Sequence, residues 1–222
     1  SNTIIAAEYD IIVDGRLTKH GAVVGRSTRA GDRKDNKAFI LNGLYKFVYA
    51  GAGFRSADAR IHARLSMNKL GNTGAGVFVN GHWFTFDIAP GNKIGASGPA
   101  FGQNAKPFAD AEGRIKPGMP FDVEILIKGG LLIYSINGEK VGEAKSFPTA
   151  METVPSKDVG SVHKLGVITA LRSWRADLKI YEFSVETDGE IVHLPEMQTI
   201  YQSGSATTHT YRIPALLESK KG

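Results

Sequence analysis

The stretch PFDVEILIKGGLLIYSINGEKVGEA, residues 120–144, decides the fold. Apolar side chains occupy every second position from Phe121 to Ile127 and again from Leu132 to Ile136. Strict alternation of this kind is the pattern of a half-buried β-strand. The dipeptides Gly129-Gly130 and Asn137-Gly138 separate the runs, and both tolerate the positive φ angles of two-residue hairpin turns. The stretch therefore predicts three antiparallel strands joined by tight turns.

The same alternation continues on both sides of this hairpin region. DARIHARLSM, residues 58–67, predicts one strand, and GVFVNGHWFTFDI, residues 76–88, predicts two strands around Asn80-Gly81. In ADLKIYEFSVE, residues 176–186, the alternation changes phase after Ile180, which indicates either a β-bulge or a strand buried on both faces. The Gly-rich residues 89–120 show little periodicity and are expected to form one long loop over a sheet edge or rim.

Composition supports an all-β chain. Its 222 residues include 26 glycines and 9 prolines, which favours short strands and many turns over long helices. We expect an antiparallel two-sheet jelly-roll sandwich over residues 1–190. The character of the sequence changes after Val185, and we expect residues 191–222 to be a linker followed by the truncated first strand of a second domain.

The formal net charge of +5 is concentrated in the first third of the chain, but the basic residues are scattered. They lack the aromatic interleaving of single-strand binders, so a nucleic-acid partner is not predicted. No apolar run reaches the roughly 20 residues that a membrane-spanning helix needs. The chain has no cysteine, which excludes disulfides and thiolate metal sites.

The predicted sandwich is similar to those of the concanavalin A-like lectin, glucanase and laminin G families. The similarity is carried by residues 121–144, by Trp83 and by the terminal IYEF strand, and it is diffuse over residues 4–190. It implies a concanavalin A-like lectin/glucanase type of fold. These families include glycan binders, adhesion modules and hydrolases, so the fold alone does not define the function.

The C-terminal stretch YQSGSATTHTYRIPALLESKKG, residues 201–222, is more specific. It resembles the first strand of the sialidase (neuraminidase) propeller, whose opening motif matches Tyr211, Arg212, Ile213 and Pro214. In that family this arginine is one of three that bind the sialic acid carboxylate, since a guanidinium offers two parallel donors to a planar anion. The resemblance therefore assigns Arg212 as a carboxylate ligand in the catalytic site of an intact parent protein.

The rest of the sialidase machinery is not present in this sequence. The other two arginines, the tyrosine nucleophile with its glutamate, the aspartate acid/base and the repeated Asp boxes are missing. The resemblance implies a parent exo-α-sialidase, of which these 222 residues alone are predicted to be inactive. It also implies an extracellular or periplasmic location, with the signal peptide outside this sequence. The implied partners are sialylated glycans and a C-terminal propeller of the same chain.

Independent chemistry in the sandwich has less support. Glu8 and Asp10 match part of a Glu-x-Asp-x-x-Glu glucanase strand, but Val13 replaces its third carboxylate. Asp122 and Glu124 are interpreted as surface carboxylates. No cofactor and no metal site are predicted, because the six histidines are dispersed. For Asp87 and Asn92 a turn role is favoured, with calcium binding as the alternative.

A carbohydrate site needs an aromatic side chain to stack on a sugar face and polar groups beside it. Trp83 is predicted to point outward from its strand, and Trp174 lies between two arginines. The candidate carbohydrate-binding residues are Trp83, Trp174, Arg60, His62 and Arg64. The favoured interpretation of the two tryptophans, however, is that they fill the sandwich core or an interface with the propeller. Two rival functions stay open: a laminin G-type adhesion module without a sialidase partner, and a stand-alone hydrolase that uses Glu8 or Asp10.

Overall fold

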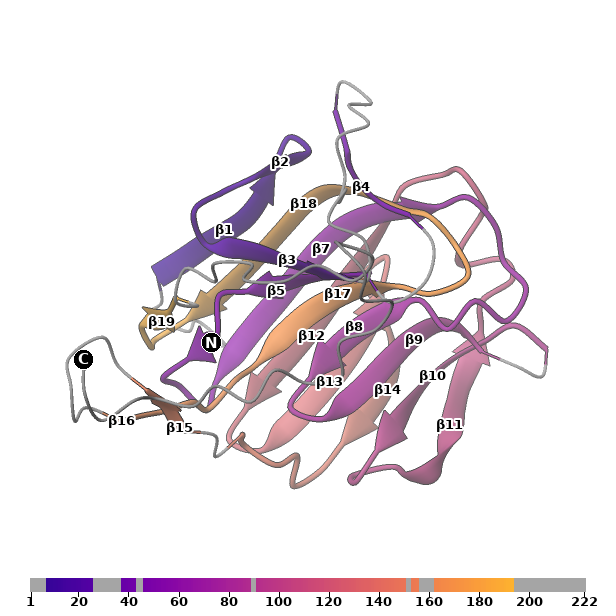
Figure 1. The fold of residues 1–222 in the computed structure, drawn as a ribbon. Helices are drawn as coiled ribbons and strands as arrows, with labels where there is room; N and C mark the ends of the chain where they lie inside the picture. Colours follow the sequence, from indigo (N-terminus) through magenta and orange to yellow (C-terminus); the bar gives the residue numbers. More distant parts are fainter. Residues whose placement is uncertain are drawn as a thin grey trace, which may run out of the picture.

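Two antiparallel sheets packed face to face make up the fold (Figure 1). The computed structural model describes residues 7–25, 37–42, 46–88, 91–150, 153–155 and 162–193. These ranges contain no helix with the length and apolar character needed to cross a bilayer. The predicted fold class, an all-β sandwich of two antiparallel sheets, is confirmed.

The eight-stranded sheet contains the three strands predicted from residues 120–144. Its order is β14 (Glu139–Ala144), β13 (Leu131–Ile136), β12 (Phe121–Lys128), β7 (Ala59–Met67), β18 (Leu178–Thr187), β1 (Ala7–Val13) and β2 (Arg16–Leu17), and β4 (Phe39–Leu41) also pairs with β18. The first and last strands of the chain's core region, β1 and β18, are therefore neighbours. This pairing brings together two segments that are far apart in the sequence.

The seven-stranded sheet contains the segment around Trp83. Its order is β11 (Gly102–Asp110), β10 (Lys93–Gly98), β9 (His82–Ile88), β8 (Gly76–Val79), β17 (Thr169–Ser173), β5 (Lys46–Ala50) and β3 (Gly21–Gly25). Two small ribbons accompany the sandwich: β15 (Thr153–Pro155) with β16 (Val162–Lys164), and β6 (Gly53–Phe54) with β19 (Ile191–Val192).

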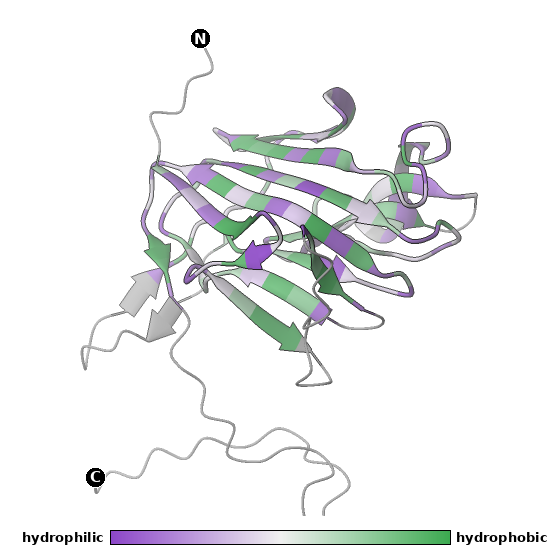
Figure 2. Cartoon of the chain, turned by 90° about the horizontal axis from the view of Figure 1, so that it is seen from above, coloured by the Kyte–Doolittle hydropathy of each residue, from purple (hydrophilic) through white to green (hydrophobic). Residues whose placement is uncertain are grey.

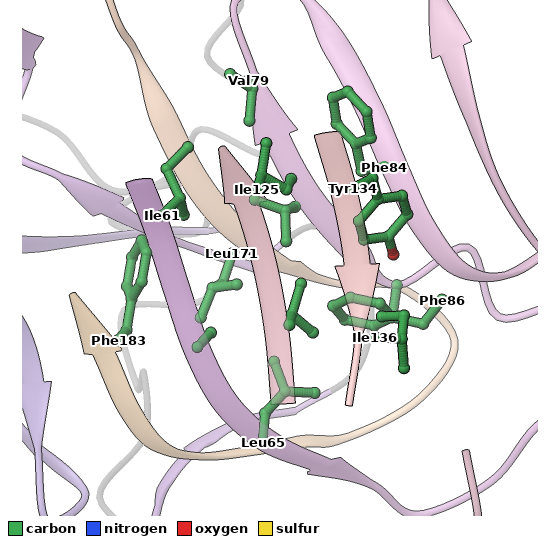
Figure 3. Packing of buried hydrophobic residues seen from close by; sticks show 14 of the residues in the cluster. Ile61, Leu65, Val79, Phe84, Phe86, Ile125, Tyr134, Ile136, Leu171 and Phe183 are labelled. Atoms are coloured by element: carbon green, nitrogen blue, oxygen red, sulfur yellow. The ribbon is translucent and has the colours of Figure 1, made fainter. Parts of the chain in front are cut away.

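The core lies between the sheets and follows from the alternation in the sequence. Hydrophobic and hydrophilic residues alternate along the strands in Figure 2. Figure 3 shows Ile61, Ile125 and Tyr134 of the eight-stranded sheet meeting Phe84 and Leu171 of the seven-stranded sheet. All five are at most 1% exposed, so each contributes close to its full burial free energy, roughly 1.5–3 kcal/mol for an aliphatic or Phe side chain.

All three predicted hairpin turns are confirmed by their backbone angles. The φ angles are 47° and 79° at Asn80-Gly81, 56° and 78° at Gly129-Gly130, and 50° and 78° at Asn137-Gly138. Two consecutive positive values define the type I′ turn, whose twist matches that of the adjoining strands. The sequence dipeptides therefore fixed both the position and the type of these turns.

We expect Gly138→Ala to lower the free energy of unfolding by about 1–2 kcal/mol, because φ there is 78° and a Cβ is strained in this region. Gly138→Asn is the matched control, since asparagine tolerates the left-handed region, and its loss is expected to be less than half as large. Urea unfolding of the variants measures both values. Equal losses would show that φ strain is not the cause.

The expectation of one long loop over residues 89–120 was wrong. This stretch contributes β10 and β11 to the edge of the seven-stranded sheet. Register shifts between Ile94 and Gly95 and between Ala96 and Gly98 interrupt the pairing of these two strands. Bulges and small side chains remove the regular alternation on which recognition of strands depends, so the pattern was weak although the strands are real.

The change of phase in the last long strand is a β-bulge, one of the two predicted outcomes. The pairing of β18 with β7 shifts register between Ile180 and Glu182, with Tyr181 as the extra residue. The Tyr181 hydroxyl lies 3.3 Å from Ser66 Oγ on the outer side of the sheet. The bulge keeps apolar residues facing the core on both sides of the shift.

One short described strand follows residue 190, the predicted domain boundary. Ile191 and Val192 form β19 and pair with Phe54 and Gly53 of β6. Residues 194–222, which include Tyr211, Arg212, Ile213 and Pro214, lie outside the described residues.

Candidate functional site

The outer face of the seven-stranded sheet gathers aromatic side chains from three strands. Strand pairing places Tyr49 opposite Ala170, Ala170 opposite Phe78, and Phe78 opposite Trp83. The neighbouring row contains Phe47, Arg172, Gly76 and Thr85. These positions share one face because residues directly opposite across strands point to the same side of a sheet.

The rings on this face touch one another. The Trp83 ring centroid lies 4.9 Å from that of Phe78 and 6.0 Å from that of Phe47, and the Phe47 and Tyr49 centroids are 5.8 Å apart. These distances are those of favourable aromatic pairs. Each of the four side chains is half-buried, so part of its surface stays accessible. We call these four residues, together with Arg172 and Trp174, the aromatic face.

Arg172 joins the two tryptophans of the aromatic face. Its Cζ atom lies 3.6 Å from the centroid of Trp83 and 4.9 Å from that of Trp174. Its Nη2 donates a hydrogen bond of 2.8 Å to the Gly74 carbonyl oxygen. A guanidinium held between two indole rings keeps its positive charge at a defined place, and such contacts contribute roughly 0.5–2 kcal/mol.

A loop beside β9 supports this arrangement. The carboxylate of Asp87, which is fully buried, accepts hydrogen bonds from the backbone N–H groups of Gly71 (2.6 Å) and Thr73 (3.4 Å) through Oδ2. Its Oδ1 is also buried and has no hydrogen-bond partner among the described residues. Asp87 therefore positions the loop whose Gly74 carbonyl receives Arg172.

Gly74 itself is required where it stands. Its φ is +63°, and a Cβ there would lie 3.2 Å from Cδ1 of Trp174. The absence of a side chain lets the Trp174 ring pack directly on the loop backbone. Trp174 is thus placed by the same loop that holds Arg172.

The other three candidate residues lie on the opposite side of the sandwich. Arg60, His62 and Arg64 point outward from β7 in the eight-stranded sheet. They face carboxylates on both neighbouring strands: Arg60 contacts Glu186 (3.1 Å) and Glu124 (3.7 Å), Arg64 contacts Asp122 (2.9 Å), and His62 Nε2 lies 3.5 Å from Asp122. The positive charge of this strand is balanced by the sheet itself.

The structure thus brings Trp83 and Trp174 together and separates them from the three basic residues. Sequence reasoning missed Arg172, Phe47, Tyr49 and Phe78 as members of the aromatic face. The alternation of Arg172 and Trp174 in LRSWR gave a local signal that both point the same way. The neighbours of Arg172 across β5 and β8 depend on strand order and register, which the sequence pattern does not specify.

The carboxylates considered for hydrolysis are spread over the eight-stranded sheet. Glu8 and Asp10 are exposed on β1, whereas Asp122 and Glu124 are on β12 and take part in the ion pairs described above. Two strands, β7 and β18, lie between β1 and β12. The pair on β1 and the pair on β12 therefore do not converge on one centre.

The residues considered for calcium have backbone partners. The Asp87 carboxylate binds the loop N–H groups, and the Asn92 carbonyl accepts a hydrogen bond of 2.8 Å from Ala111 N. Asn92 has φ = 53°, as expected of a turn residue. Within the described ranges, no group of three or more His, Cys, Asp or Glu side chains is placed to hold a metal ion.

A hollow of about 440 Å³ lies at one end of the eight-stranded sheet, away from the aromatic face. It is lined by Ile40, Asn42, Ser66, Met67, Asn68, Gly118, Asp177 and Lys179. This lining contains no aromatic ring on which a sugar stacks. The aromatic face is therefore the stronger candidate site for a sugar.

No protein-family model matches the chain, and no curated protein sequence matches it. Among solved structures, it is similar to domain 4 of an extracellular GH43 arabinanase from Geobacillus stearothermophilus in complex with arabinotriose, at 15% identity and a TM-score of 0.48. The match covers 76% of this chain and 82% of that domain.

Two further solved structures show a comparable likeness. One is the alginate lyase AlgAT5 of polysaccharide lyase family 7, at 10% identity and a TM-score of 0.48, covering 73% of this chain and 84% of that one. The other comes from work on endo-acting O-glycanases that members of the human gut microbiota express to initiate mucin breakdown, at 10% identity and a TM-score of 0.46. It covers 80% of this chain and 94% of that one. TM-scores below 0.5 support neither a family nor a function for this chain.

Proposed function

We propose that the sandwich is a non-catalytic carbohydrate-binding domain and that it holds glycan on the aromatic face. The observation that carries this proposal is the stacking of Arg172 between Trp83 and Trp174, beside further accessible rings, on one outer sheet face. Aromatic side chains pack against the C–H faces of sugars, and a fixed guanidinium donates hydrogen bonds to their oxygens.

The exposure of the residues on this face supports binding by the rings. Ala170, Gly76 and Thr85 share the two rows with the aromatic residues, and all three are buried. The accessible surface of the two rows is therefore made by the half-buried aromatic side chains and Arg172, which are the groups that stack on a sugar and donate hydrogen bonds to it.

The finer proposal is that the parent protein is an exo-α-sialidase and that the glycans are sialylated. It rests on the resemblance of residues 211–214 to the sialidase motif, with Arg212 as the carboxylate ligand, and on the fit of a carboxylated sugar to the charge of Arg172. In this proposal the present chain is catalytically inactive, and the parent acts outside the cell or in the periplasm. Bracing of a propeller by the sandwich is the alternative within the same proposal.

A laminin G-type adhesion or carbohydrate-binding module without a sialidase partner is the rival proposal. It shares the aromatic face but not the role of Arg212. The sequence beyond Gly222 separates the two: further triad arginines and Asp boxes support the sialidase, whereas a stop codon or a second sandwich contradicts it.

Binding on the aromatic face predicts that Trp83→Ala weakens glycan binding by at least about tenfold, because the variant removes the central ring of the cluster. A glycan array with matched sialylated and unsialylated ligands identifies the ligand class, and calorimetric titration with the best ligand gives the affinity. Arg64→Ala, on the opposite face of the sandwich, is the matched control and is expected to leave the affinity unchanged.

The outcomes separate the two faces and the two roles. Loss of affinity in Arg64→Ala with none in Trp83→Ala would show that glycan binds to the eight-stranded sheet and not to the aromatic face. Absence of any array signal for the unmodified chain would contradict glycan binding and favour bracing. Thermal unfolding of both variants shows whether a lost affinity reflects a lost fold.

A further inference from the structure

The last described residues are attached to the sandwich by a separate set of contacts. Val192 O accepts a hydrogen bond of 2.7 Å from Ala52 N, and Glu190 O accepts one of 3.0 Å from Arg55 N. The side chains of Arg55 and Glu190 form an ion pair of 3.3 Å. Residues 188–193 therefore lie along β6 as a strap, which we call the exit strap.

The exit strap ends on a pair of stacked imidazoles. The rings of His193 and His20 have centroids 5.3 Å apart and an interplanar angle of 20°. His20 lies in the turn before β3, where its carbonyl oxygen accepts a hydrogen bond of 2.8 Å from Gly51 N. The ring pair thus connects the end of the strap to the turn that leads into the seven-stranded sheet.

A second aromatic residue, Tyr9, packs against the His20 ring. Tyr9 of β1 meets it edge-on at a centroid distance of 5.6 Å, and Tyr9 in turn packs on Phe54 of β6 at 5.5 Å. The Nδ1 atom of His20 is buried without a hydrogen-bond partner among the described residues. A proton added at this nitrogen finds no acceptor there, so the site favours the neutral ring.

The groups around His20 together lower its pKa. Its pKa is lowered from the ordinary value by burial first, and then by His193 of the strap and Lys19 of the same turn. Asp10 of β1 acts in the opposite direction and raises it. Desolvation and like charge together therefore outweigh the one nearby carboxylate.

We propose that the stacked pair of His20 and His193 is a pH-sensitive latch that holds the exit strap on β6 at neutral pH and releases it in mild acid. When both rings are protonated, two like charges face each other about 5 Å apart, and one of them has a buried N–H without an acceptor. Undocking relieves both problems, because each imidazolium then returns to water.

The direction of the pH effect on docking of the exit strap follows from the linkage between proton binding and docking. The pKa of His20 is lower in the docked state than in a solvated one, so the undocked state binds the proton more readily. Docking is therefore strongest above the ordinary histidine pKa of about 6.5 and weakens as the pH falls below it toward the lowered value. Since the chain continues from His193 to residue 222, release of the strap lengthens the tether to the residues that follow.

Amide hydrogen exchange of the whole chain, followed by NMR and expressed as protection factors, tests the latch. The reporters are the Ala52 and Arg55 amides, which donate to the strap. Between pH 7.5 and 5.0 we expect their protection to fall by about tenfold, with the core amide of Phe86 unchanged. In His20→Phe, which keeps a stacking ring but cannot be protonated, we expect a fall of less than about twofold.

Two results would overturn the proposal. One is protection of Ala52 and Arg55 that does not change with pH in the unmodified chain. The other is an equal fall in the unmodified chain and in His20→Phe, because the protonation would then lie elsewhere. His193→Ala, which removes the stack, is expected to show low protection already at pH 7.5.

Discussion

Replacing Asn80 by alanine is expected to lower the free energy of unfolding by about 3–4 kcal/mol, the largest effect that we expect of any residue in a turn. The Asn80 side chain makes three hydrogen bonds to backbone groups far away in sequence. Nδ2 donates to the carbonyl oxygens of Gly166 (2.9 Å) and Pro148 (3.1 Å), and Oδ1 accepts from Ile168 N (2.8 Å). Alanine leaves all three backbone groups without this partner.

Two terms contribute to that loss and can be separated. Each net hydrogen bond contributes about 1 kcal/mol, and a non-glycine residue other than Asn or Asp at φ = 47° adds about 1 kcal/mol of strain. Asn80→Gly also removes the three hydrogen bonds, but glycine adopts the positive φ without strain. Its loss of stability should therefore be smaller than that of Asn80→Ala by the strain term alone. Asn80→Asp keeps the acceptor for Ile168 N but turns a carboxylate oxygen toward two carbonyls, so it is expected to be no better than alanine.

Urea unfolding of the three Asn80 variants, with the slope compared to that of the unmodified chain, measures these differences. A loss below about 1 kcal/mol in Asn80→Ala would mean that water replaces the side chain without penalty. Asn80 was recognisable from the sequence only as a turn residue. Its second role, connecting the β8–β9 hairpin to Pro148, Gly166 and Ile168, depends on tertiary contacts that no local sequence pattern records.

Period-two alternation predicted the outward direction of Trp83 and the buried sets of β7, β12 and β13 because one face of each strand packs against the other sheet. Paired Gly and Asn residues predicted the turns because few residues adopt positive φ without strain. These signals are local, so they appear directly in the sequence. The strands β10 and β11 were missed because their bulges erase the local signal.

The candidate site was predicted only in part for a related reason. Alternation predicts that the side chains of Arg64 and Trp83 both point away from the core. It does not predict to which of the two sheets each strand belongs. Arg64 belongs to the eight-stranded sheet and Trp83 to the other, so the two outward faces are opposite surfaces of the sandwich. Strand order, which depends on long-range pairing, decided the composition of the site.

Asp87→Ala is expected to destabilise the fold by about 2–3 kcal/mol and to weaken glycan binding by more than about tenfold, if the aromatic face is the site. The loss of stability follows from removing the acceptor of the Gly71 and Thr73 N–H groups at a position with no exposed surface. The loss of binding follows because the freed loop no longer holds the Gly74 carbonyl against Arg172 or the loop backbone against Trp174.

Asp58→Ala is the matched control for this loop effect. The Asp58 carboxylate also accepts a backbone hydrogen bond from a turn, that of Gly129 N at 2.9 Å, but in the hairpin between β12 and β13 of the other sheet. We therefore expect Asp58→Ala to lose stability in urea unfolding while it binds glycan as the unmodified chain does. If both variants lost binding equally, global destabilisation would explain the effect. If Asp87→Ala lost stability and kept its affinity, the loop would support the fold without positioning Arg172 and Trp174 for the ligand.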